Sequence, residues 1–344
     1  MSLNQENTSI PESSFDEISP DAVPKNLPSD IIFEILTRTS LETLDACKSV
    51  CNEWNHLICE SSFMPLYCKR TNTLFGYFIQ DMIRNKFVSM FVSTGQNSSI
   101  KNIHSDMKIL ASSDHGILCC LRINGKSFRY YVCKPVTEQW QALPNPKLRY
   151  QTAAIAMMVM KARPLRYKIV RLSKEGQTRS EDIYRCEIFD SETWTWTMLQ
   201  HINLPDSETI NSKTSLSTSN SVHWLTSEDN VLQFHKAEQS FQKFPLPKSV
   251  QGNRSYPYKQ LVQYEGRLGL TYLTQESNME LWVMQKDQWM KKMVLNIQTF
   301  NEVIFYNLED YSFTRVQLDH RLTTGEEVFQ FRSDFEPVDL GRSS

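Results

Sequence analysis

A loose motif recurs along most of the chain and limits what it can fold into. In each copy an apolar, strand-like run is followed by polar residues and then by an aromatic residue, often with a Leu-Pro pair nearby. Four copies lie at residues 131–144, 188–199, 232–247 and 281–292, and residues 303–307 resemble the start of a fifth. The aromatic markers Trp140, Trp196, Phe241 and Trp289 are 56, 45 and 48 residues apart. A period near ~50 residues is typical of propeller blades, small antiparallel sheets that bury their faces against their neighbours.

The N-terminal part of the chain has a different periodicity. From residue 26 to about residue 58 the apolar side chains recur at helical spacing, and short strand-like runs begin near residue 74. Residues 1–24 are polar and poor in large apolar side chains, which is typical of disorder. We therefore expect an α+β chain with a disordered tail (1–24), a small helical domain (25–69), a mostly antiparallel β domain (70–338) and a C-terminal tail (339–344).

The helical segment carries more large apolar side chains than so short a domain needs. Pro28 and Ser29 predict the start of a first helix, and Ser40 is placed to cap a second one. About 40 residues rarely bury enough surface to fold well alone, so we expect some of these side chains to contact a partner. Trp54 is a natural anchor for such a contact. The residues predicted to contact or support the partner are Leu27, Pro28, Ile31, Ile32, Ile35, Leu36, Val50, Cys51 and Trp54, and the sequence does not separate contact residues from core.

These residues resemble the F-box of plant F-box proteins. The likeness includes Leu27-Pro28, the Asp30–Leu36 run and the run from Cys47 to Ile58, all in the family's order and spacing. Thr39-Ser40 stands where the family usually has Leu-Pro, which implies a looser turn between the first two helices and weaker adaptor binding.

The β-rich part resembles the kelch-like F-box-associated domain that follows the F-box in many plant proteins. The likeness rests on Ser112–Cys120, on the run from Val132 to Pro144, and on the Val222-His223-Trp224-Leu225 strand. His115 and Lys134 both replace an Asn of the family pattern. Together the two resemblances span residues ~26–335 in the order that the family has.

The resemblance implies the substrate-recognition subunit of an SCF-type (Skp–cullin–F-box) ubiquitin ligase. The F-box would bind a Skp-family adaptor and, through it, the cullin and RING subunits, while the β domain would bind a target protein for ubiquitination and degradation. Such a subunit performs no bond chemistry and needs no cofactor. Two alternatives stay open: an F-box scaffold or regulator without target turnover, and a propeller enzyme with an incidental helical N-terminus.

The composition agrees with a protein-binding role. The formal net charge of −2 gives no reason to expect nucleic acid as a partner, and no apolar run approaches the ~18 residues of a membrane span. The N-terminus lacks the apolar core of a signal peptide, so we expect eight reduced cysteines and a location in the cytoplasm, the nucleus or both. We find no motif for a catalytic site, a cofactor site or a metal site. The polar segments 173–182 and 206–220 are candidate recognition loops.

Overall fold

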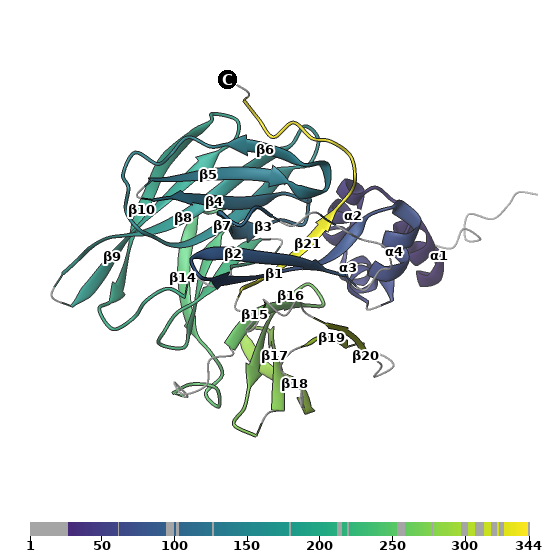
Figure 1. Cartoon of the computed structure of the whole chain (residues 1–344). Coiled ribbons are helices and arrows are strands. Elements are labelled where there is room, and N and C mark those ends of the chain that lie inside the picture. Colours follow the sequence, from purple (N-terminus) through teal and green to yellow (C-terminus); the bar gives the residue numbers. More distant parts are fainter. Residues whose placement is uncertain are drawn as a thin grey trace, which may run out of the picture.

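The computed structural model consists of a small helical module at one end of a much larger β domain (Figure 1). It describes residues 27–60, 62–93, 100, 103–125, 127–178, 180–211, 215–218, 220–252, 259–276, 278–296, 302–306, 313–317, 322 and 327–342. The predicted tail over residues 1–24 lies outside these residues. The predicted fold class, a helical domain followed by a mostly antiparallel β domain, is confirmed.

The helical module has four short helices: α1 (Ser29–Leu36), α2 (Leu41–Lys48), α3 (Asn52–Cys59) and α4 (Phe63–Thr71). Pro28 precedes α1, and the Ser40 side chain accepts a hydrogen bond from the Thr43 amide, so the predicted cap of the second helix is confirmed. The helices share one apolar core, formed by the buried side chains Ile32, Leu36, Leu41, Leu44, Cys47, Leu57, Ile58, Phe63 and Tyr67.

Four antiparallel sheets of four strands follow one another along the chain. The first contains β3 (Met107–Ser112), β4 (Leu118–Asn124), β5 (Ser127–Lys134) and β6 (Gln139–Ala142). The second contains β7 (Thr152–Lys161), β8 (Arg166–Gln177), β9 (Glu181–Asp190) and β10 (Thr195–Pro205). The third contains β11 (Leu216–Ser217), β12 (Ser221–Leu225), β13 (Asn230–His235) and β14 (Ser240–Pro245). The fourth contains β15 (Lys259–Tyr264), β16 (Arg267–Leu273), β17 (Asn278–Gln285) and β18 (Gln288–Asn296).

A three-stranded sheet closes the propeller by joining the two ends of the β domain. In this closing sheet β1 (Leu74–Ile83) pairs on one side with β2 (Lys86–Val92) and on the other with β21 (Glu327–Ser333). A two-stranded sheet of β19 (Glu302–Tyr306) and β20 (Phe313–Gln317) precedes β21 in the chain. Because β21 also lies beside β3, the closing sheet continues the ring into the first four-stranded sheet.

The recurring sequence motif corresponds to the last two strands of each four-stranded sheet. Its aromatic markers lie on β6, β10, β14 and β18, and two of them reach back to the preceding blade. The Trp196 indole donates to the Pro144 carbonyl at 2.7 Å, and the Trp289 indole donates to the Pro245 carbonyl at 3.0 Å. The motif therefore marks the seam between neighbouring blades.

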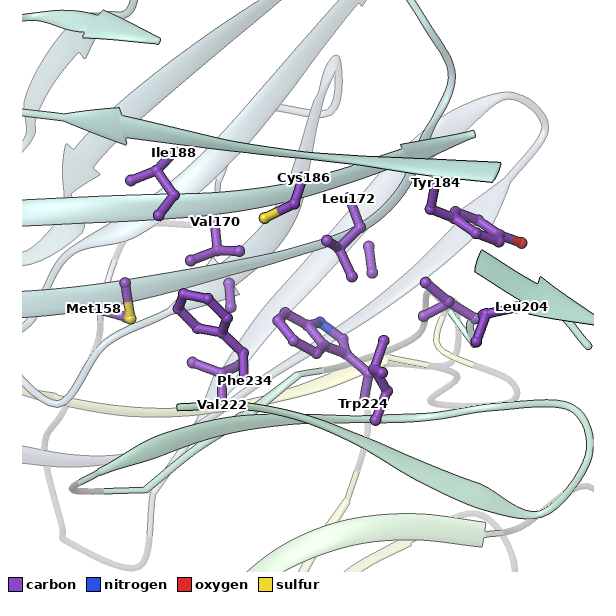
Figure 2. Packing of buried hydrophobic residues seen from close by; sticks show 14 residues of the cluster. Met158, Val170, Leu172, Tyr184, Cys186, Ile188, Leu204, Val222, Trp224 and Phe234 are labelled. Carbon is purple, nitrogen blue, oxygen red and sulfur yellow. The ribbon is translucent and has the colours of Figure 1, made fainter. Parts of the chain in front are cut away.

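Apolar side chains from facing sheets fill the space between blades. Figure 2 shows Val170, Leu172 and Cys186 of the second sheet facing Trp224 and Phe234 of the third. All five side chains are at most 1% exposed. The other face of the second sheet packs against the first sheet, so each blade depends on its neighbours for its core.

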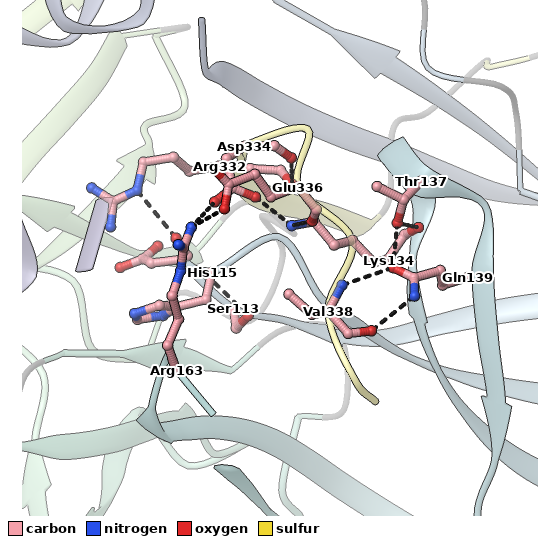
Figure 3. A network of polar contacts seen from close by, with 12 residues as sticks. Ser113, His115, Lys134, Thr137, Gln139, Arg163, Arg332, Asp334, Glu336 and Val338 are labelled. Atoms are coloured by element: carbon pink, nitrogen blue, oxygen red, sulfur yellow. Dashed lines mark hydrogen bonds and ion pairs between the residues drawn. The ribbon is translucent and has the colours of Figure 1, made fainter. Parts of the chain in front are cut away.

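The described part of the C-terminal segment packs along the β domain. Leu340 is buried, and its carbonyl accepts a hydrogen bond from the Tyr167 hydroxyl at 2.9 Å. Figure 3 shows Gln139 bonded to Val338 in the same segment, with the Gln139 amide 2.8 Å from the Val338 carbonyl. The apolar contact and these hydrogen bonds hold residues 334–342 against the first two sheets.

Candidate functional site: an apolar helical surface and a polar joint

The helical module exposes a row of apolar side chains on α1. Ile31 and Ile35 are four residues apart and lie on one side of the helix, and Leu27 precedes its first turn. Their exposed fractions are 55%, 44% and 51%, and Val50, which precedes α3, is 61% exposed. Pro28 and Cys51 are also exposed. We call these six residues the α1 surface.

The structure separates the nine predicted partner residues into two groups. Six form the α1 surface, whereas Ile32 and Leu36 point into the module's own core and are 6% and 1% exposed. Trp54 is half-buried and packs against that core. The surface side chains are therefore not needed to complete the core, and none of the described residues buries them.

Hydrogen bonds hold the helices that carry this surface. The Ser29 hydroxyl donates to the Glu53 carboxylate at 2.7 Å, which places the start of α1 beside the start of α3. At the turn where a loose connection was expected, the Thr39 hydroxyl donates to the Leu36 carbonyl at 2.9 Å. The Tyr67 hydroxyl donates to the Thr39 carbonyl at 3.2 Å. The turn at Thr39-Ser40, which replaces the family's Leu-Pro, is thus held by several hydrogen bonds in addition to the Ser40 cap.

A polar joint connects the helical module to the propeller. The carboxylate of Asp45, on α2, accepts two hydrogen bonds from the guanidinium of Arg332, on β21, at 2.7 and 2.9 Å. The His115 ring, in the turn between β3 and β4, lies 3.1 Å from the same carboxylate. Arg332 also donates to the Asp114 carbonyl at 3.1 Å. Figure 3 shows Arg332 beside His115, and their contacts with Asp45 join three elements far apart in the sequence.

Burial and charge compete at this joint. Burial alone would raise the pKa of Asp45, but the charges of Arg332, Lys48 and His115 lower it to about 2. The Arg332 side chain is only 2% exposed, and Asp45 helps raise its pKa despite that burial. Burial lowers the pKa of His115, against the attraction of Asp45. The joint therefore holds a paired carboxylate and guanidinium at neutral pH.

The helical module also lies over one end of a cavity of about 370 Å³ inside the propeller. Asp45 and Lys48 line the cavity from α2, while His115, Lys236 and Gln263 line it from the first, third and fourth sheets. A second contact supports this position, because Gly266, in the turn between β15 and β16, lies against Asn55 of α3. An added Cβ at Gly266 would lie 2.7 Å from the Asn55 amide nitrogen.

Sequence reasoning missed this joint. Asp114 and His115 lie in the turn before the buried strand β4, and nothing near Asp45 or Arg332 in the sequence indicates that these side chains meet. Among the described residues, no three His, Cys, Asp or Glu side chains are grouped as metal ligands would be. None of the described helices is long and apolar enough to cross a membrane.

The comparisons with known proteins agree with this architecture. Residues 25–65 match the F-box domain, and residues 84–308 match the family described as "F-box protein At3g26010-like, beta-propeller". F-box protein At5g41720 of Arabidopsis thaliana is 32% identical over 161 residues, covering 43% of this chain and 86% of that protein. F-box protein At5g49610 of the same plant is 26% identical over 277 residues, covering 75% of each chain. A protein of unknown function from Dyadobacter fermentans, 12% identical, superimposes with a TM-score of 0.41 over 75% of this chain and 78% of its own.

Proposed function

The chain belongs to the plant F-box proteins with a C-terminal β-propeller, and we propose that it is the substrate-recognition subunit of an SCF-type ubiquitin ligase. In this proposal the F-box binds a Skp-family adaptor, which connects it to the cullin and RING subunits. The propeller binds a target protein for ubiquitination and degradation. The observation that carries the proposal is the α1 surface, an apolar surface on a module whose core is already complete.

Physical reasons favour a protein partner for this surface. Ile31 and Ile35 are about half exposed although they lie on the same short helix as the fully packed Leu36. Apolar side chains grouped on a surface lose contact with water when a partner covers them, and this stabilises the complex. The F-box family supplies the identity of that partner, a Skp-family adaptor.

The chain itself contributes proximity rather than bond chemistry. A target held on the propeller and an adaptor held on α1 would be kept at a set distance by the polar joint around Asp45 and Arg332. Fixing two reactants in one complex removes the entropic cost of bringing them together. We place this role in the cytoplasm, the nucleus or both, where the ligase subunits act.

A binding assay tests the α1 surface. The full chain would be titrated with a purified Skp-family adaptor and compared with the double variant Ile31→Ala/Ile35→Ala. We expect saturable binding by the unchanged chain and at least about tenfold weaker binding by the variant, because two half-exposed isoleucines lose their contacts. The matched control is Met160→Ala/Met290→Ala, which removes two propeller side chains that are 54% and 49% exposed.

Each result has a definite meaning. Equal adaptor binding by the unchanged chain and a folded Ile31→Ala/Ile35→Ala variant would show that this face is not the docking surface. If the folded, unchanged chain does not bind the adaptor, the ligase proposal fails. Leu36 is left unchanged because its side chain is buried, and truncating it would confuse loss of binding with loss of folding.

A further inference from the structure

The propeller has a basic edge on the face that points away from the helical module. The helical module contacts the ends of β21 and of the β3–β4 hairpin at the opposite face. Exposed basic side chains on the far face come from the β1–β2 turn, from the end of β4 and the start of β5, and from the segment between β6 and β7. These are Arg84, Lys86, Arg122, Arg129, Lys147 and Arg149, which we call the basic edge.

Hydrogen bonds bring the separate parts of the basic edge together. The Phe87 amide, next to Lys86, donates to the Ser105 carbonyl at 2.9 Å, so the β1–β2 turn lies beside the start of the first four-stranded sheet. One residue further, Asp106 accepts a hydrogen bond from Arg122 at 2.6 Å. The closing sheet and the first sheet are therefore adjacent at this end.

The segment between β6 and β7 joins the same edge. The Asn145 side-chain amide donates to the Phe128 carbonyl at 3.2 Å, which places Asn145, two residues before Lys147, against the start of β5. Arg129 follows Phe128, and it faces Arg122 directly across the β4–β5 pair. The six basic side chains thus belong to one continuous region rather than to scattered turns.

The charges of this edge are mostly unmatched. Asp106 pairs with Arg122, but within the described residues no carboxylate lies at ion-pair distance from the other five basic side chains. Like charges placed opposite each other destabilise a strand pair, and Asp106 offsets only the Arg122 charge, so a carboxylate bound at Arg129 would relieve the remaining repulsion. Elsewhere in the propeller many lysines are paired, as Lys174 is with Asp182 and Lys243 with Glu208.

Exposed apolar side chains are interspersed with these charges. Met82 lies two residues before Arg84, whereas Ile123 and Leu148 directly adjoin basic residues; the three are 66%, 46% and 38% exposed. Single-stranded nucleic acid is usually bound on exposed aromatic rings, and among the described residues of this edge no exposed residue is Phe, Tyr or Trp. Unmatched cations with aliphatic neighbours fit a peptide that carries both carboxylates and apolar side chains.

We propose that the basic edge binds an acidic segment of the target protein, with aliphatic residues between its Asp and Glu side chains. This inference rests on the proposed function and specifies the chemical class of the target. Arginine forms paired hydrogen bonds to carboxylates, and Arg129 and Arg149 are exposed and form no ion pair with another of the described residues. The edge lies at the far end of the propeller from the α1 surface, so the adaptor and an acidic segment can bind at the same time (Figure 1).

The test measures binding of a fluorescent synthetic peptide in which glutamates alternate with leucines. The full chain is compared with Arg129→Glu/Arg149→Glu and with a control, Lys161→Glu/Lys286→Glu, which changes the net charge equally through exposed lysines outside the edge. We expect the first variant to bind at least about tenfold more weakly and the control to bind as the unchanged chain does. A peptide with glutamine in place of glutamate should not bind.

Three results would overturn the inference: no binding of the acidic peptide by the folded chain, equal losses in both variants, or equal binding of the glutamine peptide. A single-stranded oligothymidine that binds the edge more tightly than the peptide would show that the edge serves nucleic acid instead. The same preparations are assayed for adaptor binding. If the unchanged chain binds the adaptor but not the peptide, only the proposal for the basic edge is refuted. If the unchanged chain does not bind the adaptor, the proposed function is refuted.

Discussion

Breaking the polar joint between α2 and β21 should destabilise the protein measurably. In an Arg332→Met variant the Asp45 carboxylate would lose both hydrogen bonds from the guanidinium, at 2.7 and 2.9 Å, in a site where Arg332 is 2% exposed. Removing one partner of a buried ion pair costs about 3–5 kcal/mol. Asp45 keeps Lys48 at 2.9 Å and His115 at 3.1 Å, so we expect a loss at or just below the lower end of that range, about 2–3 kcal/mol.

The pKa of Asp45 gives an independent value for the stability that this joint contributes. The fall from 3.8 to about 2 corresponds to roughly 2 kcal/mol of preferential stabilisation of the ionised form. Because this pKa is lower in the folded protein than in the unfolded chain, the contribution is fully present above about pH 4. It is lost as the pH falls from about 4 to about 2, where the folded carboxylate also becomes protonated.

Urea denaturation, followed by tryptophan fluorescence, measures these free energies of unfolding. The unchanged chain is compared with Asp45→Asn, Arg332→Met and the double variant, and we expect the double variant to lose less than the sum of the single losses. The control, Arg38→Met, removes the exposed ion pair with Glu34 and should leave stability nearly unchanged, since solvent screens such pairs. Strictly additive losses, or an Arg332→Met loss no larger than that of the control, would refute the reasoning. So would a difference between Asp45→Asn and the unchanged chain that stays constant from pH 4 to pH 2.

Two further predictions concern the propeller alone. Burial lowers the pKa of His223 from 6.5 to about 4, so stability is lost as the pH falls through this range and the ring becomes protonated. In urea titrations, the free energy of unfolding of the unchanged chain should fall by about 3 kcal/mol more than that of His223→Gln between pH 7 and pH 4. Leu340→Ala should lower the free energy of unfolding by at least about 2 kcal/mol, because the side chain is buried against the first two sheets. The control Leu148→Ala changes an exposed leucine and should lower the free energy of unfolding by under about 0.5 kcal/mol in the same assay. Equal losses in Leu340→Ala and Leu148→Ala would show that the C-terminal segment is not packed in solution.

The sequence motif predicted the blades because its residues act locally. Trp196 and Trp289 lie on the last strand of their sheets, and each contacts the proline at the end of the preceding blade. An aromatic residue, a Leu-Pro pair and a spacing near ~50 residues are all visible without knowledge of the fold. The closing sheet was not visible in this way, since β1 and β21 pair across the length of the whole domain.

The partner residues of the helical module could be predicted as a group, but the sequence did not separate exposed residues from core residues. Ile31 and Ile32 are neighbours in the sequence, yet one is 44% exposed and the other 6%. Successive helical residues differ in direction by about 100°, so a broad apolar stripe includes both the core side and part of the surface side. Only the positions of α2, α3 and α4 decide which edge of the stripe is covered. The joint was unpredictable for a related reason, because Asp45, His115 and Arg332 resemble ordinary surface residues until the fold brings them together.

The two proposed binding surfaces are at opposite ends of one connected body, and the polar joint is what makes their separation fixed. The α1 surface belongs to helices held on the propeller by Arg332 and by the contact of Asn55 with Gly266. The basic edge belongs to the first and closing sheets, and the closing sheet also contains β21, the strand that carries Arg332. The same strand therefore connects both surfaces with little freedom between them. A target lysine must still move to the ubiquitin-loaded enzyme. With both surfaces fixed in this way, that movement must come from the target or from the other ligase subunits rather than from a hinge at this joint.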